Sequence, residues 1–287
     1  MLNQTTIPYK ILLILVFFTL PVLSGAAEET LPPVVDIEGN TKRVVVIDPA
    51  HGGGDWGATI RGVHEKHITL ELALLVRDKI NAAEKDITAM VTREEDAFMK
   101  AEQRAGFANT NKGDAFISIH CDYLEASGVN GYRIYYQAGK PLEKPGEEEI
   151  ELIRWKDTQR YHIDESMRFA SYISQYMQAA LIPEESSVTG NDENDLVPLL
   201  TRREKAVYSY ILCGVNMPAI QMEVGNMNNK NDFDYLRDKE TINRIAYHIK
   251  EGVIQYFQDK FFEENGGETA EGEEGEAEET EEGGGVR

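Results

Sequence analysis

Short apolar runs alternate with helix-like segments between residues 43 and 262, and this alternation restricts the fold more than any other feature of the chain. Each run has the length of a buried strand and is bounded by polar or turn-forming residues. The six runs are residues 44–47, 87–92, 115–119, 131–136, 208–213 and 219–224. Strands that alternate with helices favour parallel pairing. We therefore predict a single α/β domain with a mixed, mostly parallel central sheet of about six strands flanked by helices.

The segments between these runs carry apolar residues at helical spacing. A first helix is predicted to begin at Glu65, with an apolar face made of Ile68, Leu72, Leu75, Val76 and Ile80. A second covers residues 97–111, and a third is capped by Ser166 and buries Phe169, Ile173, Met177 and Leu181. The inner face of a long last helix holds Ile242, Ile245, Ile249, Val253, Phe257 and Phe261.

The charge of the chain is concentrated at its carboxyl end. The formal net charge is -21 over 287 residues, and residues 263–287 contribute -10 of it through eleven Glu and one Arg. The other 262 residues therefore carry -11, which argues against nucleic-acid binding because that function needs a basic face. The tail has almost no apolar surface to bury, so we predict that residues 263–287 are disordered.

The amino terminus has the features of a secretory signal peptide. Lys10 precedes an apolar run of thirteen residues at positions 11–23, interrupted by Pro21, and small residues follow at positions 24–27. The run is short for a membrane span, although an uncleaved anchor stays open as the alternative. We predict a signal peptide at residues 1–27, a linker at 28–42, and a mature protein in the periplasm or cell envelope without a transmembrane domain.

Residues 137–165 interrupt the alternation of strands and helices. They contain Pro141, Pro145, Trp155 and the acidic run 147–149. Insertions of this length in a compact domain are often lids or binding loops, so we expect a lid or a docking segment for a protein activator. The alternative is a solvated acidic loop.

Two cysteines, Cys121 and Cys213, are too few for a disulfide framework and have no metal-binding spacing. Two buried thiols are favoured over one disulfide.

The first apolar run leads into the most distinctive stretch of the chain, VVVIDPAHGGGDWGA at residues 44–58. Asp48 and Pro49 are expected to end the strand, because proline cannot continue a ladder of hydrogen bonds. His51 then lies at the mouth of the strand, and three glycines follow it. Glycines allow a sharp turn and a close approach of the backbone to an ion or substrate. A histidine that merely caps the strand is the alternative.

Other potential ligands stand at comparable positions. Glu65 opens the first helix, His120 ends the third strand, and Glu223 ends the last strand. In a parallel sheet these strand ends meet at one edge, where open α/β sheets bind ligands. Two histidines and one glutamate form a known catalytic zinc set, and a further carboxylate can act as general base. Each residue also has a plain structural explanation, such as helix-dipole stabilisation for Glu65.

Four motifs together resemble a known family. The segments DPAHGGGDWGA, HEKHITLELA, DAFISIHCD and MPAIQMEVGNMNN are similar to those of the zinc-dependent N-acetylmuramoyl-L-alanine amidases of the amidase-3 group. The resemblance covers about residues 44–258. It implies that His51, Glu65 and His120 hold Zn²⁺ and that Glu223 is catalytic. Arg93 and Arg104 also fall at family positions, and we interpret both as structural.

Three departures from the family pattern remove no proposed ligand. Ala50, Thr69 and Cys121 stand where the family commonly has Gly, Asn and Ala. His64 and His67 flank Glu65, but the motif places Glu65 in the site, and we expect both histidines to be exposed.

The resemblance thus implies an exported zinc amidase, in a domain spanning residues 43–262. Its substrate would be the amide bond between N-acetylmuramic acid and L-alanine in the peptidoglycan stem peptide. The residues themselves leave open another zinc-dependent envelope hydrolase, such as an exopeptidase or deacylase, and a non-catalytic cell-wall binding module.

Overall fold

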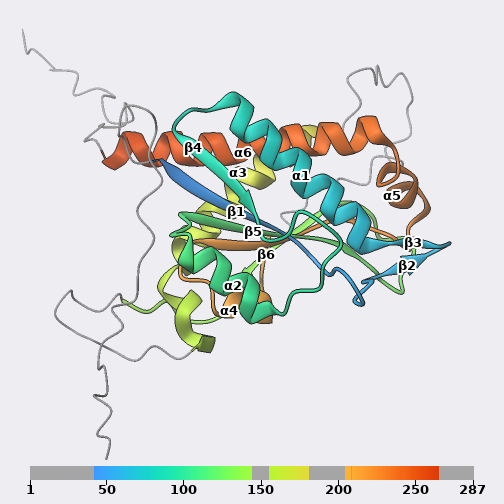
Figure 1. Cartoon of the computed structure of the whole chain (residues 1–287), viewed down its shortest axis with the longest axis horizontal. Helices are drawn as coiled ribbons and strands as arrows, with labels where there is room; N and C mark the ends of the chain where they lie inside the picture. Colours follow the sequence, from blue (N-terminus) through green and yellow to red (C-terminus); the bar gives the residue numbers. More distant parts are fainter. Residues whose placement is uncertain (1–41, 144–154, 181–203, 208, 265–287) are drawn as a thin grey trace, which may run out of the picture. The chain divides into compact units, whose positions relative to one another are not determined.

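The computed structural model describes residues 42–143, 155–180, 204–207 and 209–264, which form a six-stranded sheet with helices on both faces (Figure 1). The strand order is β4-β1-β5-β8-β6-β7. Strands β4 (Ile87–Val91), β1 (Arg43–Pro49), β5 (Ala115–Asp122) and β8 (Ala219–Asn226) are mutually parallel. Strand β6 (Arg133–Gln137) runs antiparallel to β8, and β7 (Glu204–Val207) is parallel to β6. The predicted α/β fold with a mixed, mostly parallel sheet is confirmed.

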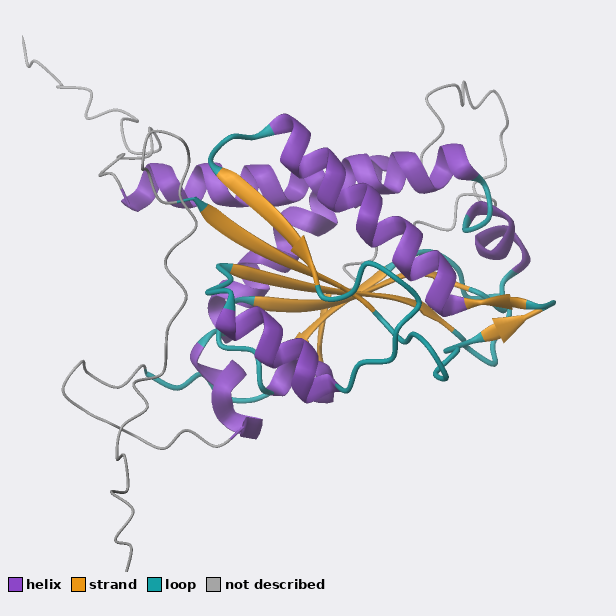
Figure 2. Cartoon of the chain, in the orientation of Figure 1, coloured by secondary structure: helices purple, strands orange, loops and turns teal. Residues whose placement is uncertain are grey.

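Two layers of helices cover the sheet (Figure 2). On one side lie α1 (Glu65–Ala83), α3 (Ile163–Ala180) and α6 (Lys239–Glu264). On the other lie α2 (Ala101–Thr110), α4 (Tyr210–Cys213) and the 3-10 helix η1 (Trp155–Tyr161). A hairpin of β2 (Thr59–Ile60) and β3 (Val63–His64) precedes α1, and α5 (Lys230–Tyr235) follows β8. Within the part of the chain described, no helix is long and apolar enough to span a membrane.

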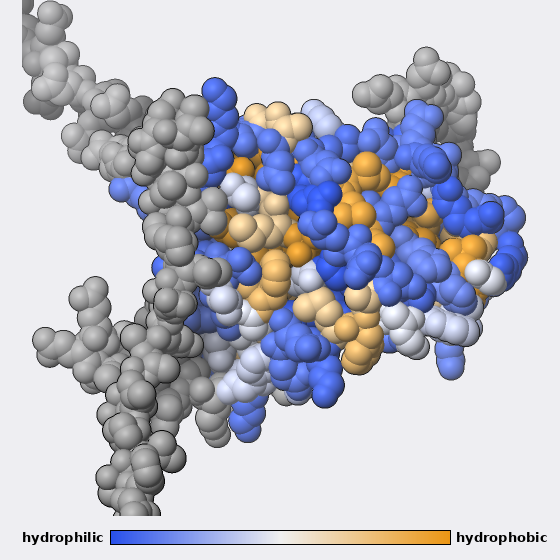
Figure 3. All heavy atoms as spheres, in the orientation of Figure 1, coloured by the Kyte–Doolittle hydropathy of each residue, from blue (hydrophilic) through white to orange (hydrophobic). Residues whose placement is uncertain are grey.

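The alternation of side chains along each strand produces two separate cores. Val45, Ile47, Ile117 and Ile119 face α1 and α6 in the larger core, whereas Val44, Val46 and Phe116 pack against α2 and α4. The helices turn their apolar faces inward. Figure 3 accordingly shows hydrophilic side chains over most of the visible face, with smaller hydrophobic patches between them.

The sheet face that carries α2 changes character along the strands. The strands begin with apolar residues on this face, namely Val44, Val46, Phe116 and Ala219. Toward the carboxyl ends of β1, β5 and β8, and at the facing amino end of the antiparallel strand β6, the same face carries polar side chains. One row across four strands is Asp48, Ser118, Gln221 and Tyr135, and the next row is His120, Glu223 and Arg133. The apolar half builds the core, and the polar half provides a surface for chemistry.

Strand β1 does not end where the sequence predicted. It continues through Asp48 and Pro49, which pair with Ser118 and Ile119 of β5. The Ala50 N–H donates to the Ile119 carbonyl, so the backbone groups of Pro49 face the other way, toward the side where β4 has already ended. Because no ladder bond is needed there, the missing N–H of proline costs nothing.

The fifth predicted strand, residues 208–213, was wrong. Residues Tyr210–Cys213 form the helical turn α4, and the strand lies earlier, at Glu204–Val207. A run of only four apolar residues is ambiguous between strand and helix. The helical turn buries Leu212 and Cys213 in the core under α2.

Several smaller predictions need correction. Helix α3 begins at Ile163, so Ser166 lies inside it rather than capping it, and α2 begins at Ala101 instead of residue 97. Phe261 is 63% exposed, not on the inner face of α6. That helix also continues to Glu264, two residues past the predicted boundary.

The two cysteines are buried free thiols, as predicted. The predicted insertion at residues 137–165 starts in β6 and ends in α3, and its second half includes η1. Its centre at 144–154 lies outside the described residues. So do Leu181, the predicted signal peptide at 1–27, the predicted linker at 28–42 except for residue 42, and most of the acidic tail.

Candidate metal centre

His51 lies in a backbone turn that is fixed by hydrogen bonds from two buried arginines. Its φ is 61°, in the left-handed region, which costs energy for a residue with a Cβ atom. Arg104 donates to the carbonyls of Pro49 (2.7 Å) and His51 (2.6 Å), and Arg93 donates to those of Pro49 (3.0 Å) and Ala50 (2.9 Å). The interpretation of Arg93 and Arg104 as structural residues is therefore confirmed.

A buried ion pair joins this turn to the sheet. Asp48 is fully buried and accepts hydrogen bonds from Arg104 (2.7 Å), Thr92 (2.6 Å) and Ser118 (2.8 Å). Three donors compensate the carboxylate for its loss of water. The loop that carries His51 is thus anchored to α2, β4 and β5 at once.

Glu65 is the first residue of α1 and reaches back toward the end of β5. Its carboxylate accepts backbone N–H groups from both sides, Ala58 on Oε2 and Cys121 on Oε1, each at 2.8 Å. The side chain is only 5% exposed. Gly57 makes room for it: a Cβ on Gly57 would lie 2.5 Å from Glu65 Oε2, and its φ of +64° favours glycine as well.

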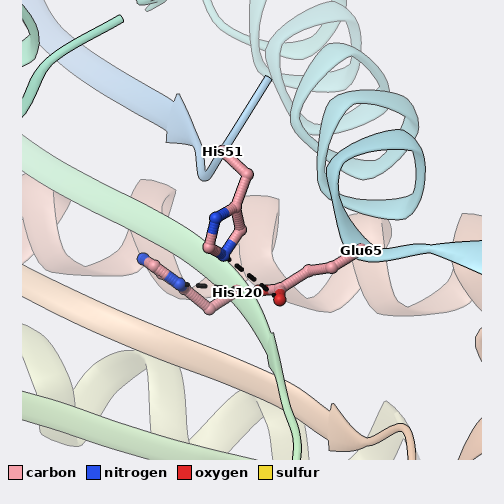
Figure 4. A group of neighbouring side chains, drawn as sticks. All are labelled: His51, Glu65 and His120. Carbon is pink, nitrogen blue, oxygen red and sulfur yellow. Dashed lines mark ion pairs between the residues drawn. The ribbon is translucent and has the colours of Figure 1, made fainter. Parts of the chain in front are cut away.

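His51, Glu65 and His120 converge on one point (Figure 4). One ligand atom from each lies within 4.8 Å of the others. His51 Nε2 is 3.1 Å from Glu65 Oε2, and His120 Nδ1 is 3.6 Å from Glu65 Oε1. Two imidazoles and a carboxylate match the donor set of catalytic zinc sites, which leave a fourth position open. The residues present therefore fit a zinc ion.

The outer contacts of both histidines decide which ring nitrogen is left for a metal. His51 Nδ1 lies 2.9 Å from the Asp55 carboxylate, which only accepts hydrogen bonds, so Nδ1 carries a proton and Nε2 remains. Ser118 donates its hydroxyl to Asp48, so it accepts from His120 Nε2 at 3.1 Å, and Nδ1 remains. These two nitrogens are the ones that face Glu65. Such outer contacts orient metal-binding histidines in general.

The electrostatics of the cluster reflect its mutual pairing. Burial disfavours the charged form of His51, but hydrogen bonds and charge from Glu65 and Asp55 outweigh it and raise the pKa of His51 to about 9. The pKa of His120 is also raised, because Glu65 and Glu223 outweigh burial. Burial would raise the pKa of Glu65, but the two histidines hold it well below its usual range. Without a metal, the two histidines therefore favour their protonated forms, whose positive charge pairs with Glu65.

Glu223 lies beside this cluster on the neighbouring strand. It is the register partner of His120 across β5 and β8, so the two side chains share one face of the sheet. It is 7% exposed, and burial raises its pKa above the usual range, although the His120 charge and a hydrogen bond from Gln221 act in the opposite direction. A carboxyl group with a raised pKa is suited to taking up and releasing a proton near neutral pH.

The other two histidines of the motif stay outside the cluster. His67 is exposed, as predicted, and lies 3.7 Å from Asp96. His64 is half-buried and packs on the Trp56 ring, with centroids 4.7 Å apart.

Sequence reasoning did not find the residues that support the site: Asp48, Asp55, Ser118 and Gln221. A signal was present for two of them. Ser118 and Gln221 are polar residues within apolar strands, each two positions before His120 or Glu223, and such residues share a face.

Comparison with known proteins agrees with this geometry. The sequence profile of the N-acetylmuramoyl-L-alanine amidase (amidase-3) family matches residues 45–255. The chain is 28% identical to the uncharacterised protein YqiI of Bacillus subtilis over 77% of this chain and 86% of that protein. It is 26% identical to the amidase LytC of B. subtilis over 75% of this chain, but it spans only 35% of LytC.

Among solved structures, the catalytic domain of the amidase CwlV from Bacillus (Paenibacillus) polymyxa var. colistinus is 27% identical. The match covers 75% of this chain and 98% of that domain, with a TM-score of 0.57. The family match at residues 45–255 covers all six strands of the sheet except Arg43 and Val44 of β1, and it includes all four candidate site residues. The chain belongs to the N-acetylmuramoyl-L-alanine amidase family of the amidase-3 type.

Proposed function

We propose that this protein is a zinc-dependent amidase that hydrolyses the bond between the lactyl group of N-acetylmuramic acid and L-alanine of the peptidoglycan stem peptide. The observation that carries the proposal is the convergence of His51, Glu65 and His120 within 4.8 Å, with Glu223 as the register partner of His120. The family supports the choice of bond.

His51 Nε2, Glu65 and His120 Nδ1 would hold the zinc ion, which supplies Lewis acidity for activating water and polarising the amide carbonyl. Asp55 and Ser118 keep the remaining ring nitrogens protonated, so the two ligand nitrogens stay available. Glu223 would accept the proton from the attacking water and donate it to the departing amine. Burial raises the pKa of Glu223, which makes its carboxylate a better base toward the attacking water.

The direct test is product analysis on purified muropeptides. An amidase releases the intact stem peptide with a free L-alanine amine and leaves the glycan unshortened. Release of single D-amino acids would indicate an exopeptidase, and release of acetate a deacetylase; either result overturns the proposal. Absence of turnover with zinc bound would favour a binding module.

Variants assign the roles. His51→Ala and His120→Ala should each lose zinc and activity together, measured by metal analysis and turnover. Glu223→Gln should keep zinc but lose about 10²-fold or more in kcat, because an amide is a poor base. Glu71→Gln, the same change at an exposed position of α1, is the matched control. A Glu223→Gln enzyme within a few-fold of wild type would show that another group is the base.

Export and regulation are part of the same proposal. Peptidoglycan lies outside the cytoplasmic membrane, so residues 1–27 would direct export to the cell envelope, testable by amino-terminal sequencing of the mature protein. The insertion at residues 137–165 would act as a lid or as a docking segment for a protein activator. Gln159 of η1 donates to the Val215 and Met217 carbonyls, so a deletion test should stop at residue 153. Higher basal activity after this deletion would support a lid, and unchanged activity would contradict it.

A further inference from the structure

The carboxylate of Glu223 is held on one side by a chain of two polar residues. Gln221 lies two positions earlier on β8, on the same face, and its Nε2 donates to Glu223 Oε1 at 2.9 Å. Ser209, just before α4, donates its hydroxyl to Gln221 Oε1 at 2.8 Å. Both ends of the Gln221 amide are therefore engaged.

The ionised carboxylate of Glu223, which only accepts hydrogen bonds, determines which way the amide points, and the Ser209 hydroxyl holds the opposite end of the amide. A glutamine amide can flip by 180°, which would place its carbonyl oxygen against the carboxylate of Glu223 and repel it. The Ser209 hydroxyl can donate or accept, so it follows the amide and donates to Oε1 while the NH₂ group is directed at Glu223. This orientation is the only one that satisfies the carboxylate.

Ser209 is itself fixed by the fold. Its N–H donates to the side-chain oxygen of Gln137 on β6 at 3.2 Å, and its carbonyl accepts the Cys213 N–H at 3.2 Å in the single turn of α4. The side chain of Gln137 is buried, and Ser209 is 6% exposed. The helical turn that sequence reasoning predicted as a strand thus presents a hydroxyl to the middle of the sheet.

Only one oxygen of Glu223 is engaged in this way. Among the described residues, hydrogen bonding to Glu223 is confined to Oε1, and Oε2 is left for a proton. We propose that Gln221, held by Ser209, is a positioning residue that fixes the Glu223 carboxylate with Oε2 turned toward the reacting atoms. The inference rests on the proposed function, in which Glu223 is the general base.

Kinetics give the first test. Gln221→Leu keeps the approximate size of the side chain and removes the donor. We expect kcat to fall by about 10-fold or more with KM and zinc content unchanged, because a hydrogen bond to a charged group is lost. Ser209→Ala should give a smaller loss in the same direction, and Ser209→Thr, which keeps the hydroxyl, should restore most of it. Gln175→Leu on the exposed face of α3 is the matched control.

A double-variant cycle separates positioning from a merely structural role. If Gln221 acts through Glu223, Gln221→Leu should have little further effect on kcat in a Glu223→Gln background. An equal fall in both backgrounds, together with a lower melting temperature, would overturn the proposal. So would a kcat within twofold of wild type in the single variant.

Crystal structures of the wild-type and Gln221→Leu proteins keep the inference separate from the proposed function. The carboxylate of Glu223 should be displaced or occupy several rotamers in the variant, whatever the substrate proves to be. If the wild-type protein cleaves no muropeptide, the proposed function fails but the structural comparison still decides the positioning role. An unmoved Glu223 carboxylate would overturn it.

Discussion

Zinc binding to the metal-free protein should release protons in a way that depends strongly on pH. In the metal-free site the pKa of His51 is raised from 6.5 to about 9 by Glu65 and Asp55, against the effect of burial. A zinc ion needs the neutral imidazole, so it must displace the proton from Nε2. The competition between proton and metal is therefore built into the geometry of the site.

The number of protons released and the loss of zinc affinity follow from the raised pKa of His51. At pH 7.5 an unperturbed histidine is roughly 10% protonated, whereas His51 with a pKa of about 9 is roughly 97% protonated. Zinc binding at that pH should thus release about one proton from His51, and more in total because the pKa of His120 is also raised. Displacing the His51 proton lowers the apparent zinc affinity by about 30-fold at pH 7.5, about 2 kcal/mol. The affinity should then rise about tenfold or more per pH unit until pH approaches 9.

Isothermal titration calorimetry in buffers of different ionisation enthalpy measures the number of protons released. Asp55→Asn is an informative comparison, since it removes one of the two charges that raise the pKa of His51 while keeping an acceptor for Nδ1. The pH at which the affinity stops rising should move down in this variant. Release of less than half a proton at pH 7.5, or an affinity independent of pH between 6.5 and 8.5, would refute the reasoning.

Three further results are expected. Arg104→Met should lower the free energy of unfolding by about 3–5 kcal/mol, because it leaves the buried Asp48 carboxylate without its cation. The melting temperature should fall by about 6–20 °C, and a fall of less than about 2 °C would contradict this expectation. Gly57→Ala should weaken zinc binding by about tenfold or more, since its Cβ would meet Glu65 and His51, whereas Gly62→Ala, also at positive φ (+79°) but in open space, should leave the affinity unchanged. Protonated His51 stabilises the metal-free protein, because its pKa is higher in the folded state than in the unfolded state. This stabilisation is fully present below pH 6.5 and is lost as the pH rises through about 9. The difference in melting temperature between the metal-free wild-type protein and a His51→Gln variant should therefore shrink between pH 6.5 and 9.

The fold could be predicted from the sequence because its strands are short, apolar and separated by helices with clear periodicity. The strands β1, β4, β5 and β8 lie within two or three residues of their predicted positions. The carboxyl ends of parallel strands must meet at one edge, so His51, His120 and Glu223 could be placed together before any coordinates were known. The structure brings these residues and Glu65 together.

The elements that were missed are those that local sequence does not determine. Residues 204–207 contain Glu, Lys, Ala and Val, and this composition gives no strand signal; the edge position beside β6 decides their conformation. Residues 210–213 are apolar enough for either element, and the helical turn buries Leu212 and Cys213. Tertiary context overrides weak local preference in both cases.

The contacts that support the site were hidden for a different reason. Asp48, Ser118 and Gln221 stand in one row across three neighbouring strands, but nothing in the sequence states which strands are neighbours or in which register they pair. Only the spacing within a strand was visible: a serine two residues before His120, and a glutamine two residues before Glu223. The register shows that these two polar residues are neighbours in one row, which lies next to the row that contains His120 and Glu223.

The geometry of strands explains why the supporting layer takes this form. Residues i and i+2 face the same side about 7 Å apart along the strand, so a short side chain such as Ser118 and a longer one such as Gln221 can each reach the side chain two positions ahead. For His120 and Glu223 the strand backbone thereby sets the spacing between the side chain and the supporting residue two positions before it. The preceding row on the same face belongs to the core under α2, where Val46 and Phe116 are register partners. A substitution in the supporting row therefore acts on two properties at once, the orientation of the reacting side chain and the boundary of the core. This is why its effect on kcat has to be measured beside its effect on stability, in both the wild-type and the Glu223→Gln backgrounds.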